Sequence, residues 1–349
     1  MGAEATTFHP SPASLMRVDD CPVCGSNVRT NLYHDLTDNA FGAVGGSWSL
    51  WRCQNCTSAY LDPRLSDAAL PRAYTNYYTH GGPAASAGGL KHRLKALLYR
   101  RSRRWRNRPY GSPSRRLYAG LAARWPHLAQ VTERTTRYLP AKAAGRLLDV
   151  GCGNGAYLAL VRDMGWSVRG CDFDSEAVTA AAAKGLQVRV GGIESFDVAE
   201  KFDAITMNHV IEHVPDPGDT LAQAFRRLAP GGQLFIETPN IDAQGHKIFG
   251  AHWRGLEAPR HLILFNHKSL RAVLDATGFT NIRSHPTLPG ARSAILEKSA
   301  LMYDGRSPYE APEGLSPAAS RSMNVPPDAD PDHSELLIYV AEKPRSCGR

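Results

Sequence analysis

The stretch that decides the fold is RLLDVGCGNG, from Arg146 to Gly155. Its first five residues predict a short buried strand, because they are mostly aliphatic and run directly into glycine. The glycines at positions 151, 153 and 155 permit a tight turn and let a ligand lie against bare backbone. Residues 156–164 carry apolar side chains at helical spacing. A strand, a glycine turn and a helix in this order predict a nucleotide-binding crossover.

This glycine turn fits two classes of cofactor. Gly151-x-Gly153-x-x-Ala156 fits a dinucleotide fingerprint if alanine replaces the third glycine. Asp149 argues against that interpretation, because an acid two residues before the first glycine suits a cationic ligand better than a pyrophosphate. The pattern acid-x-Gly-x-Gly-x-Gly resembles motif I of the class I S-adenosylmethionine (SAM) methyltransferases, whose ligand carries a sulfonium and an α-ammonium group.

Three further segments resemble the same family in the same order. The segment GGIE at 191–194 resembles the loop on the adenine side, residues 202–216 resemble motif IV, and LAPGGQLFI at 228–236 resembles the approach to the fifth strand. Asp172 lies 21 residues after Gly151, where an acid can bind the ribose hydroxyls of either cofactor class. The four matches favour SAM over a dinucleotide. The resemblance implies that the cofactor is held by Asp149, Gly151, Gly153, Gly155, Asp172, Ile193 and Asn208.

Length and composition predict a folded protein of more than one part, and the order of its elements predicts an α/β fold. The 349 residues exceed one ordinary domain, and 42% hydrophobic residues suffice for a core. We expect a cytoplasmic protein, since neither a secretory signal nor an apolar run of roughly 18 residues is visible. The seven expected strands alternate with helices and predict a doubly wound, Rossmann-like sheet in which, by the resemblance, the last strand is inserted antiparallel. They are residues 146–150, 167–171, 187–190, 203–207, 232–237, 281–285 and 335–341.

Two CxxC pairs predict a metal site near the N-terminus. Cys21 with Cys24 and Cys53 with Cys56 suit a tetrahedral zinc site with four thiolates. Disulfides or unused thiols are the alternative, which a reducing compartment disfavours. Because four thiolates leave no open coordination position, the expected zinc is structural.

The expected organisation has four parts. They are a disordered N-terminus at 1–17, a zinc-binding module at 18–65, a helical linker at 66–139 and a SAM-dependent methyltransferase domain at 140–349. Within the linker we expect helices at 65–78, 90–108 and 118–138.

The linker also holds an unusual concentration of positive charge. The net charge is +8, and residues 91–116 alone contribute 11 Lys or Arg and no acid. Such a segment suits an anionic membrane surface near a lipid-linked substrate, or the backbone of RNA, or it is simply a solvated helix. We expect membrane contact to be possible and nucleic acid to be the less favoured partner.

Candidate catalytic residues follow the fourth and fifth strands, because ligands of open α/β sheets bind at the carboxyl ends of the strands. Asn208-His209 with Glu212-His213 would line the methionine end of SAM by the resemblance, with His213 either catalytic or packed. The segment from His252 to Phe265 resembles the "W…E-x-P-x-H-x-x-x-F" segment of zinc-containing methyltransferases from glycan and sugar pathways. We predict His261 as the general base and Glu257 as the residue that orients it or binds substrate. The alternative is that His261 caps the next helix.

A group of tyrosines near the zinc module is a third candidate. Tyr74, Tyr77 and Tyr78 could present hydroxyl groups to a sugar or could pack between domains.

Residues 18–345 as a whole resemble bacterial class I methyltransferases with an N-terminal zinc-ribbon-like module, including the sugar C-methyltransferase type. The resemblance implies methyl transfer from SAM to a sugar, a glycan precursor, a nucleotide-sugar or a related lipid-linked metabolite. The long basic segment and the region around Tyr74 depart from that type, so the acceptor and the methylated atom stay open. The alternatives are an RNA methyltransferase that binds RNA through the zinc module and basic helix, and a SAM-fold binding protein without turnover.

Overall fold

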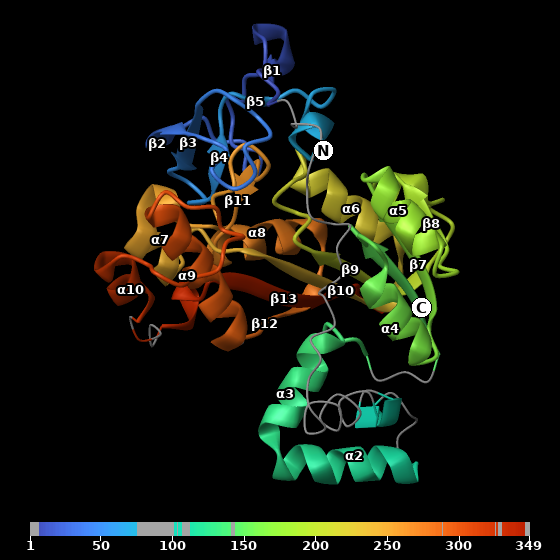
Figure 1. The fold of residues 1–349 in the computed structure, drawn as a ribbon. Coiled ribbons are helices and arrows are strands. Elements are labelled where there is room, and N and C mark those ends of the chain that lie inside the picture. The colour runs from blue at the N-terminus through green and yellow to red at the C-terminus, as the bar shows by residue number, and fades with distance from the viewer. Residues whose placement is uncertain are drawn as a thin grey trace. The chain divides into compact units, whose positions relative to one another are not determined.

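A computed structural model describes residues 7–74, 101–102, 104–106, 112–140, 144–287, 289–324, 326 and 330–345 (Figure 1). The chain divides into two compact units. The first contains the described residues of Met1–Tyr77 together with Asn208–Ala222 and Ile236–Tyr339. The second contains those of Tyr78–Met207, Gln223–Phe235 and Val340–Arg349.

The predicted doubly wound sheet is confirmed. Its seven strands have the order β12-β13-β10-β9-β6-β7-β8. Strand β6 is parallel to both neighbours, with Val150 opposite Cys171 of β7 and opposite Met207 of β9. The strands are β6 (Arg146–Val150), β7 (Ser167–Asp172), β8 (Val188–Val190), β9 (Phe202–Asn208), β10 (Leu228–Pro239), β12 (Thr280–Ser284) and β13 (Leu336–Glu342).

The inserted last strand is confirmed as well. Strand β13 lies between β10 and β12. It runs antiparallel to β10, because Lys343 N–H donates to the carbonyl of Gly232 at one end and Asn240 N–H donates to the carbonyl of Glu335 at the other. All but the last of its seven residues are buried, as expected for a strand with neighbours on both edges.

Helices follow the strands as predicted, with local differences. In the second unit α4 and α5 contact β7, and Figure 1 shows them beside that strand. The expected helix at 118–138 is two helices, because Pro126 begins a new one after Trp125. The helices are α2 (Pro113–Arg124), α3 (Pro126–Thr135), α4 (Ala156–Asp163), α5 (Ser175–Ala182), α6 (Pro217–Arg227), α7 (Gln244–Phe249), α8 (His267–Thr277), α9 (Pro289–Tyr303) and α10 (Pro317–Met323).

The N-terminal part forms a second sheet with the order β11-β4-β3-β2. Its strands are β2 (Arg29–Leu36), β3 (Trp48–Cys53), β4 (Ala59–Leu61) and β11 (Ile263–Leu264). Strand β11 belongs to the segment after the fifth strand of the large sheet, and it pairs antiparallel with β4. The segment that holds Glu257 and His261 is therefore tied to the cysteine-containing sheet (Figure 1).

Two expectations for the N-terminal region are wrong where the structure describes it. Residues 7–17 are not disordered, because β1 (Leu15–Met16) pairs with β5 (Arg64–Leu65) and Phe8 bridges to Val44. The expected helix at 65–78 is instead the end of β5 followed by the 3₁₀ helix η2 (Leu70–Tyr74), while residues 75–78 lie outside the described part.

The compact units do not follow the predicted boundaries at 65/66 and 139/140. One hydrophobic core contains Trp48 and Leu61 from the N-terminal sheet together with Trp253 and Leu264 from the segment after β10. Both sets of residues bury apolar surface against each other, so they form one unit.

Candidate functional site

The glycine loop between β6 and α4 has the geometry that the sequence predicts. Gly151, Gly153 and Gly155 all have positive φ, at 68°, 51° and 76°. A Cβ on Gly155 would lie 2.4 Å from Leu186, so close packing as well as φ requires glycine there. A Cβ on Gly153 would meet nothing within 4 Å. The loop thus leaves open space beside bare backbone at its centre.

Asp172 fixes this loop. Its Oδ2 accepts the backbone N–H of Gly153 at 2.8 Å, and its Oδ1 accepts that of Asp174 at 3.0 Å. The carboxylate lies at the end of β7, beside the turn that ends β6, as predicted from the spacing. Its binding of ribose hydroxyls stays a prediction.

Asp149 has a partner that the sequence analysis missed. Its side chain is buried and forms an ion pair with Arg137, while its Oδ1 also accepts the hydroxyl of Thr206 at 2.6 Å. Burial raises the pKa of Asp149, and the charge of Arg137 opposes that shift. The guanidinium of Arg137 lies 3.7 Å from the centre of the Tyr157 ring. No periodicity or motif marks Arg137, which follows α3 with positive φ.

The remaining oxygen of Asp149 is relevant to the cofactor. Among the described residues, Oδ2 is a buried acceptor without a hydrogen-bond donor. A ligand with an ammonium group could satisfy this oxygen, so the residues present fit a ligand of SAM's chemistry.

The other two predicted cofactor residues lie after β8 and at the end of β9. Ile193 begins the 3₁₀ helix η3 (Ile193–Ser195) after Gly191 and Gly192, and it is buried. Asn208 is the last residue of β9, directly after Met207. Their contacts with a cofactor stay predictions.

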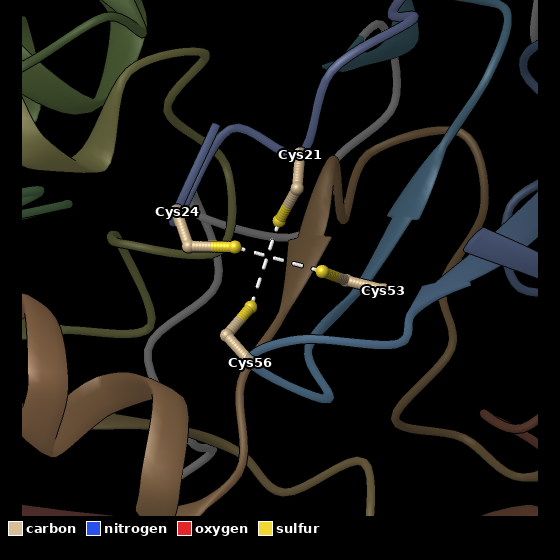
Figure 2. A group of neighbouring side chains, drawn as sticks. All are labelled: Cys21, Cys24, Cys53 and Cys56. Atoms are coloured by element: carbon tan, nitrogen blue, oxygen red, sulfur yellow. Dashed lines mark hydrogen bonds between the residues drawn. The ribbon is translucent and has the colours of Figure 1, made fainter. Parts of the chain in front are cut away.

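The four cysteines converge as predicted for a metal site. Figure 2 shows their sulfur atoms directed toward a common centre, with Cys21 Sγ 3.6 Å from Cys56 Sγ and Cys24 Sγ 3.6 Å from Cys53 Sγ. All four sulfurs lie within 4.8 Å of one another. Tetrahedral Zn–S bonds of about 2.3 Å place sulfurs roughly 3.8 Å apart, so the donor set fits zinc. These are contacts between free thiols and not disulfides.

Glu257 and His261 come together as predicted. The distance from His261 Nε2 to Glu257 Oε2 is 3.6 Å. His261 Nδ1 donates to the carbonyl of Gly255 at 2.7 Å, an assignment that leaves Nε2 as the nitrogen with a lone pair. Burial lowers the pKa of His261 to about 4, with Glu257 opposing the shift, so the imidazole is neutral at neutral pH. His261 does not cap α8, since Asn266 and Ser269 form the capping box there.

Glu257 is held ionised by two arginines. Arg254 forms an ion pair with its Oε2, and Arg260 Nε donates to its Oε1 at 3.1 Å. Burial alone would raise the pKa of Glu257, but the charges of Arg254 and Arg260 outweigh burial and hold it well below the usual range.

Arg260 connects this pair to the N-terminal sheet through Asp38, a contact that the sequence analysis also missed. Both side chains are buried, and Arg260 Nη1 lies 2.9 Å from Asp38 Oδ2. Asp38 in turn accepts the backbone N–H groups of Phe41, Ala43 and Val44. No motif or spacing in the sequence relates Arg260 to Asp38, because the two residues are 222 positions apart.

Of the tyrosine group, only Tyr74 is described. Its hydroxyl lies 3.0 Å from His213 Nδ1, which also lies 3.0 Å from the carbonyl of Arg260. The His213 and His261 rings are 4.7 Å apart between centroids. Tyr77 and Tyr78 lie outside the described residues.

The basic segment is described only in part. Ser102 and Arg106 are buried against α3, where Ser102 Oγ lies 3.0 Å from Thr132 Oγ1 and Arg106 Nε donates to Glu133 at 2.6 Å. Residues 91–100, 103 and 107–111 lie outside the described part. No helix within the described residues is long and apolar enough to cross a membrane.

The strand order and the glycine loop define the Rossmann-like fold of the class I methyltransferases. In agreement, residues 123–284 match the model of a family described as a methyltransferase domain.

The curated relatives share one name. The chain is 33% identical over 141 residues to the ubiquinone biosynthesis O-methyltransferase of Xanthomonas oryzae pv. oryzae, a match covering 35% of this chain and 59% of that protein. It is 30% identical over 147 residues to the protein of that name from Thiobacillus denitrificans, covering 37% of this chain and 63% of that protein. The chain thus covers less than two thirds of the length of these relatives.

Solved structures with a similar fold include one N-methyltransferase and one possible N-methyltransferase. The phosphoethanolamine N-methyltransferase 2 of Haemonchus contortus in complex with SAM has a TM-score of 0.43 and 18% identity, over 63% of this chain and 53% of that one. A possible histamine N-methyltransferase of Thermotoga maritima has a TM-score of 0.41 and 17% identity, over 64% and 98%. The TM-scores lie below 0.5, so the fold assignment rests on strand order and the family match.

Proposed function

We propose that this chain is a SAM-dependent methyltransferase for a small-molecule acceptor. The observation that carries the proposal is the glycine loop closed by Asp172, within a segment that matches a methyltransferase domain. Relatives named as O-methyltransferases support a small molecule with a hydroxyl group. Within that class, the resemblance of the Glu257–His261 segment favours a sugar, a glycan precursor, a nucleotide-sugar or a lipid-linked metabolite.

The cofactor would be held by the residues around the glycine loop. The loop backbone offers close approach, Asp172 offers a carboxylate for ribose, and Asp149 Oδ2 offers an acceptor for an ammonium group. Ile193 and Asn208 complete the proposed set. When bound, SAM supplies an electrophilic methyl group on sulfur. The protein's contribution is then alignment, exclusion of water and, for a hydroxyl acceptor, removal of a proton.

The proposed catalytic pair is His261 with Glu257. Neutral His261 can accept a proton or a hydrogen bond from the acceptor only at Nε2, because Nδ1 is engaged with Gly255. Glu257 lies beside that nitrogen, where its negative charge would stabilise the protonated ring, or it would bind substrate. Substitution of His261 by alanine should leave SAM affinity unchanged and lower turnover, whereas full turnover would remove the pair from the proposal.

Two measurements test the function itself. Isothermal titration should detect SAM binding to the full chain, and Asp172→Ala should abolish most of it. Methyl-labelled SAM should then transfer label to an acceptor from a panel of nucleotide-sugars, lipid-linked sugars and phenols. Absence of SAM binding would refute the proposed function, and binding without transfer to any acceptor would favour the non-catalytic alternative.

We also propose that the four cysteines hold a structural zinc ion. Their sulfurs have the separation that tetrahedral coordination needs, and four thiolates leave no position for a substrate. Elemental analysis of the purified protein should find one zinc per chain, and a variant with Cys53 and Cys56 replaced by serine should have none.

The basic segment, residues 91–116, is proposed to contact an anionic membrane surface near a lipid-linked acceptor. Its charge supports this, although Arg106 is already engaged with Glu133. Flotation with vesicles that contain anionic lipid should recover the protein, and vesicles without such lipid should not. Salt-sensitive binding in an RNA gel shift would instead favour the RNA methyltransferase alternative.

A further inference from the structure

A second imidazole–carboxylate pair lies directly after β9. His209 Nδ1 is 3.1 Å from Glu212 Oε1, and the other oxygen of Glu212 accepts the hydroxyl of Thr238 at 2.9 Å. The backbone carbonyl of Glu212 accepts the N–H of Leu262 at 2.8 Å. Glu212 is therefore fixed at both its carboxylate and its backbone, and it sets the orientation of the imidazole.

This arrangement determines which nitrogen of His209 is available. Glu212 is ionised, because the hydrogen bond from His209 and the nearby histidines outweigh burial and lower its pKa to about 2. An ionised carboxylate accepts a hydrogen bond, so Nδ1 must donate to it. Nε2 of the neutral ring then carries the lone pair. Glu237 Oε1 lies 3.8 Å from Nε2, beyond hydrogen-bond distance, and an ionised carboxylate has no proton to donate to that lone pair.

His209 is more exposed to solvent than His261. The side chain of His209 is 42% exposed, whereas that of His261 is 5% exposed. His209 also has a positive φ of 54°, fixed by the hydrogen bond from its N–H to the carbonyl of Glu237 at 2.8 Å. A left-handed backbone at a non-glycine residue is uncommon and is concentrated at functional positions. The residue before it, Asn208, ends a central strand of the large sheet, where ligands of this fold class bind.

The two histidines also differ in pKa, and this difference again favours His209 as the base. Burial alone would lower the pKa of His209, but the hydrogen bond to Glu212 and the charges of Glu212, Glu237 and Glu257 raise it above its ordinary value. The pKa of His261 is lowered to about 4. A general base is most effective when its pKa lies near the working pH, which favours His209.

We propose that His209, oriented by Glu212, is the group that takes the proton of the acceptor hydroxyl. This inference rests on the proposed methyltransferase function. It assigns Glu212 as a positioning residue and replaces the base role proposed above for His261, so that His261 and Glu257 bind and orient the acceptor. The proton passes from the hydroxyl oxygen to Nε2, the oxygen's electron pair forms the new bond to the methyl carbon, and the pair of the broken carbon–sulfur bond stays on sulfur. The imidazolium then returns the proton to solvent, to which the ring is exposed.

The pair can be tested without an acceptor. Nitrogen NMR of the full chain with labelled histidine should show His209 in the Nδ1–H form, with a pKa above the ordinary 6.5. Glu212→Gln should lower that pKa, and the spectrum of the exposed His34 should be the same in the variant and the wild type. A wild-type His209 in the Nε2–H form, or a pKa that does not respond to Glu212→Gln, would overturn the proposal.

Kinetics then separate this inference from the proposed function. With SAM and catechol or a nucleotide-sugar as probe acceptors, His209→Gln should lower kcat/KM by about 10²–10⁴-fold and remove the acidic limb of the pH profile. SAM affinity should not change, imidazole should restore part of the rate to His209→Gly, and His34→Gln should behave as wild type. Full activity of His209→Gln would overturn the inference alone. Failure of the wild type to bind SAM would overturn the proposed function, while the NMR result would still decide whether the pair exists.

Discussion

Replacing Asp38 by asparagine should destabilise the first unit strongly although the change in volume is small. Arg260 is fully buried, and its Nη1 and Nη2 both bind the Asp38 carboxylate. Asparagine keeps one acceptor oxygen but removes the charge, and its amide group would face backbone N–H groups that now donate to the carboxylate. Breaking a buried ion pair by changing one partner costs about 3–5 kcal/mol. Because Glu257 still neutralises part of the arginine charge, we expect about 3 kcal/mol.

Asp67→Asn is the matched control for this experiment. Asp67 also pairs with an arginine, with Arg64 Nη1 at 2.7 Å, but its side chain is 68% exposed. Exposed pairs contribute at most about 1 kcal/mol, so this variant should be close to wild type. Urea unfolding followed by tryptophan fluorescence compares the two, and hydrogen exchange should be faster at residues 254–261 in Asp38→Asn alone. Equal stability of the two variants would refute the reasoning.

Three further predictions concern the cofactor, the metal and pH. Asp172→Asn keeps an acceptor for the Gly153 N–H but loses the charge, so we expect SAM affinity to fall by about 10-fold or more, measured by titration calorimetry. Removal of zinc by a chelator, or Cys53→Ser, should lower the free energy of unfolding by several kcal/mol, and unchanged urea unfolding would contradict a structural role. The pKa of Glu212 is lowered from 4.5 to about 2 by folding, so its stabilisation is present above pH 4.5 and is lost as the pH falls toward 2. Glu212→Gln should flatten this acid limb of a stability–pH profile, and an unchanged limb would exclude Glu212 as its cause.

The sequence predicted the large sheet because that information is local. Strands β6, β9, β10 and β13 each contain an apolar run. The glycine loop and Asp172 have a spacing that can be recognised without knowledge of packing. The four-cysteine site could be predicted because its signal is also local: two CxxC pairs indicate a tetrahedral set of four thiolates.

The contacts that the sequence did not predict join residues far apart in the chain, and no sequence periodicity or motif marks them. Arg137 reaches Asp149 from the end of a helix, and Asp38 reaches Arg260 across more than two hundred residues. His209 could be singled out in the sequence as a candidate. That it is more exposed than His261 and has a higher pKa follows only from the neighbours that the fold places around the two rings. Residues 7–17 were expected to be disordered because the pairing of Leu15 with Leu65 cannot be read from a two-residue strand.

The pairing of β11 with β4 has a consequence for exchanging parts between related proteins. Consider a chimera whose N-terminal cysteine segment comes from another protein. In it, β11 would pair with a foreign strand in place of β4, and Arg260 would face a foreign residue in place of Asp38. The segment that holds Glu257 and His261 in one parent would then pair with a sheet from the other parent. Functional recombination should therefore succeed when residues 7–74 and 236–287 are transferred together, and it should fail when either is transferred alone.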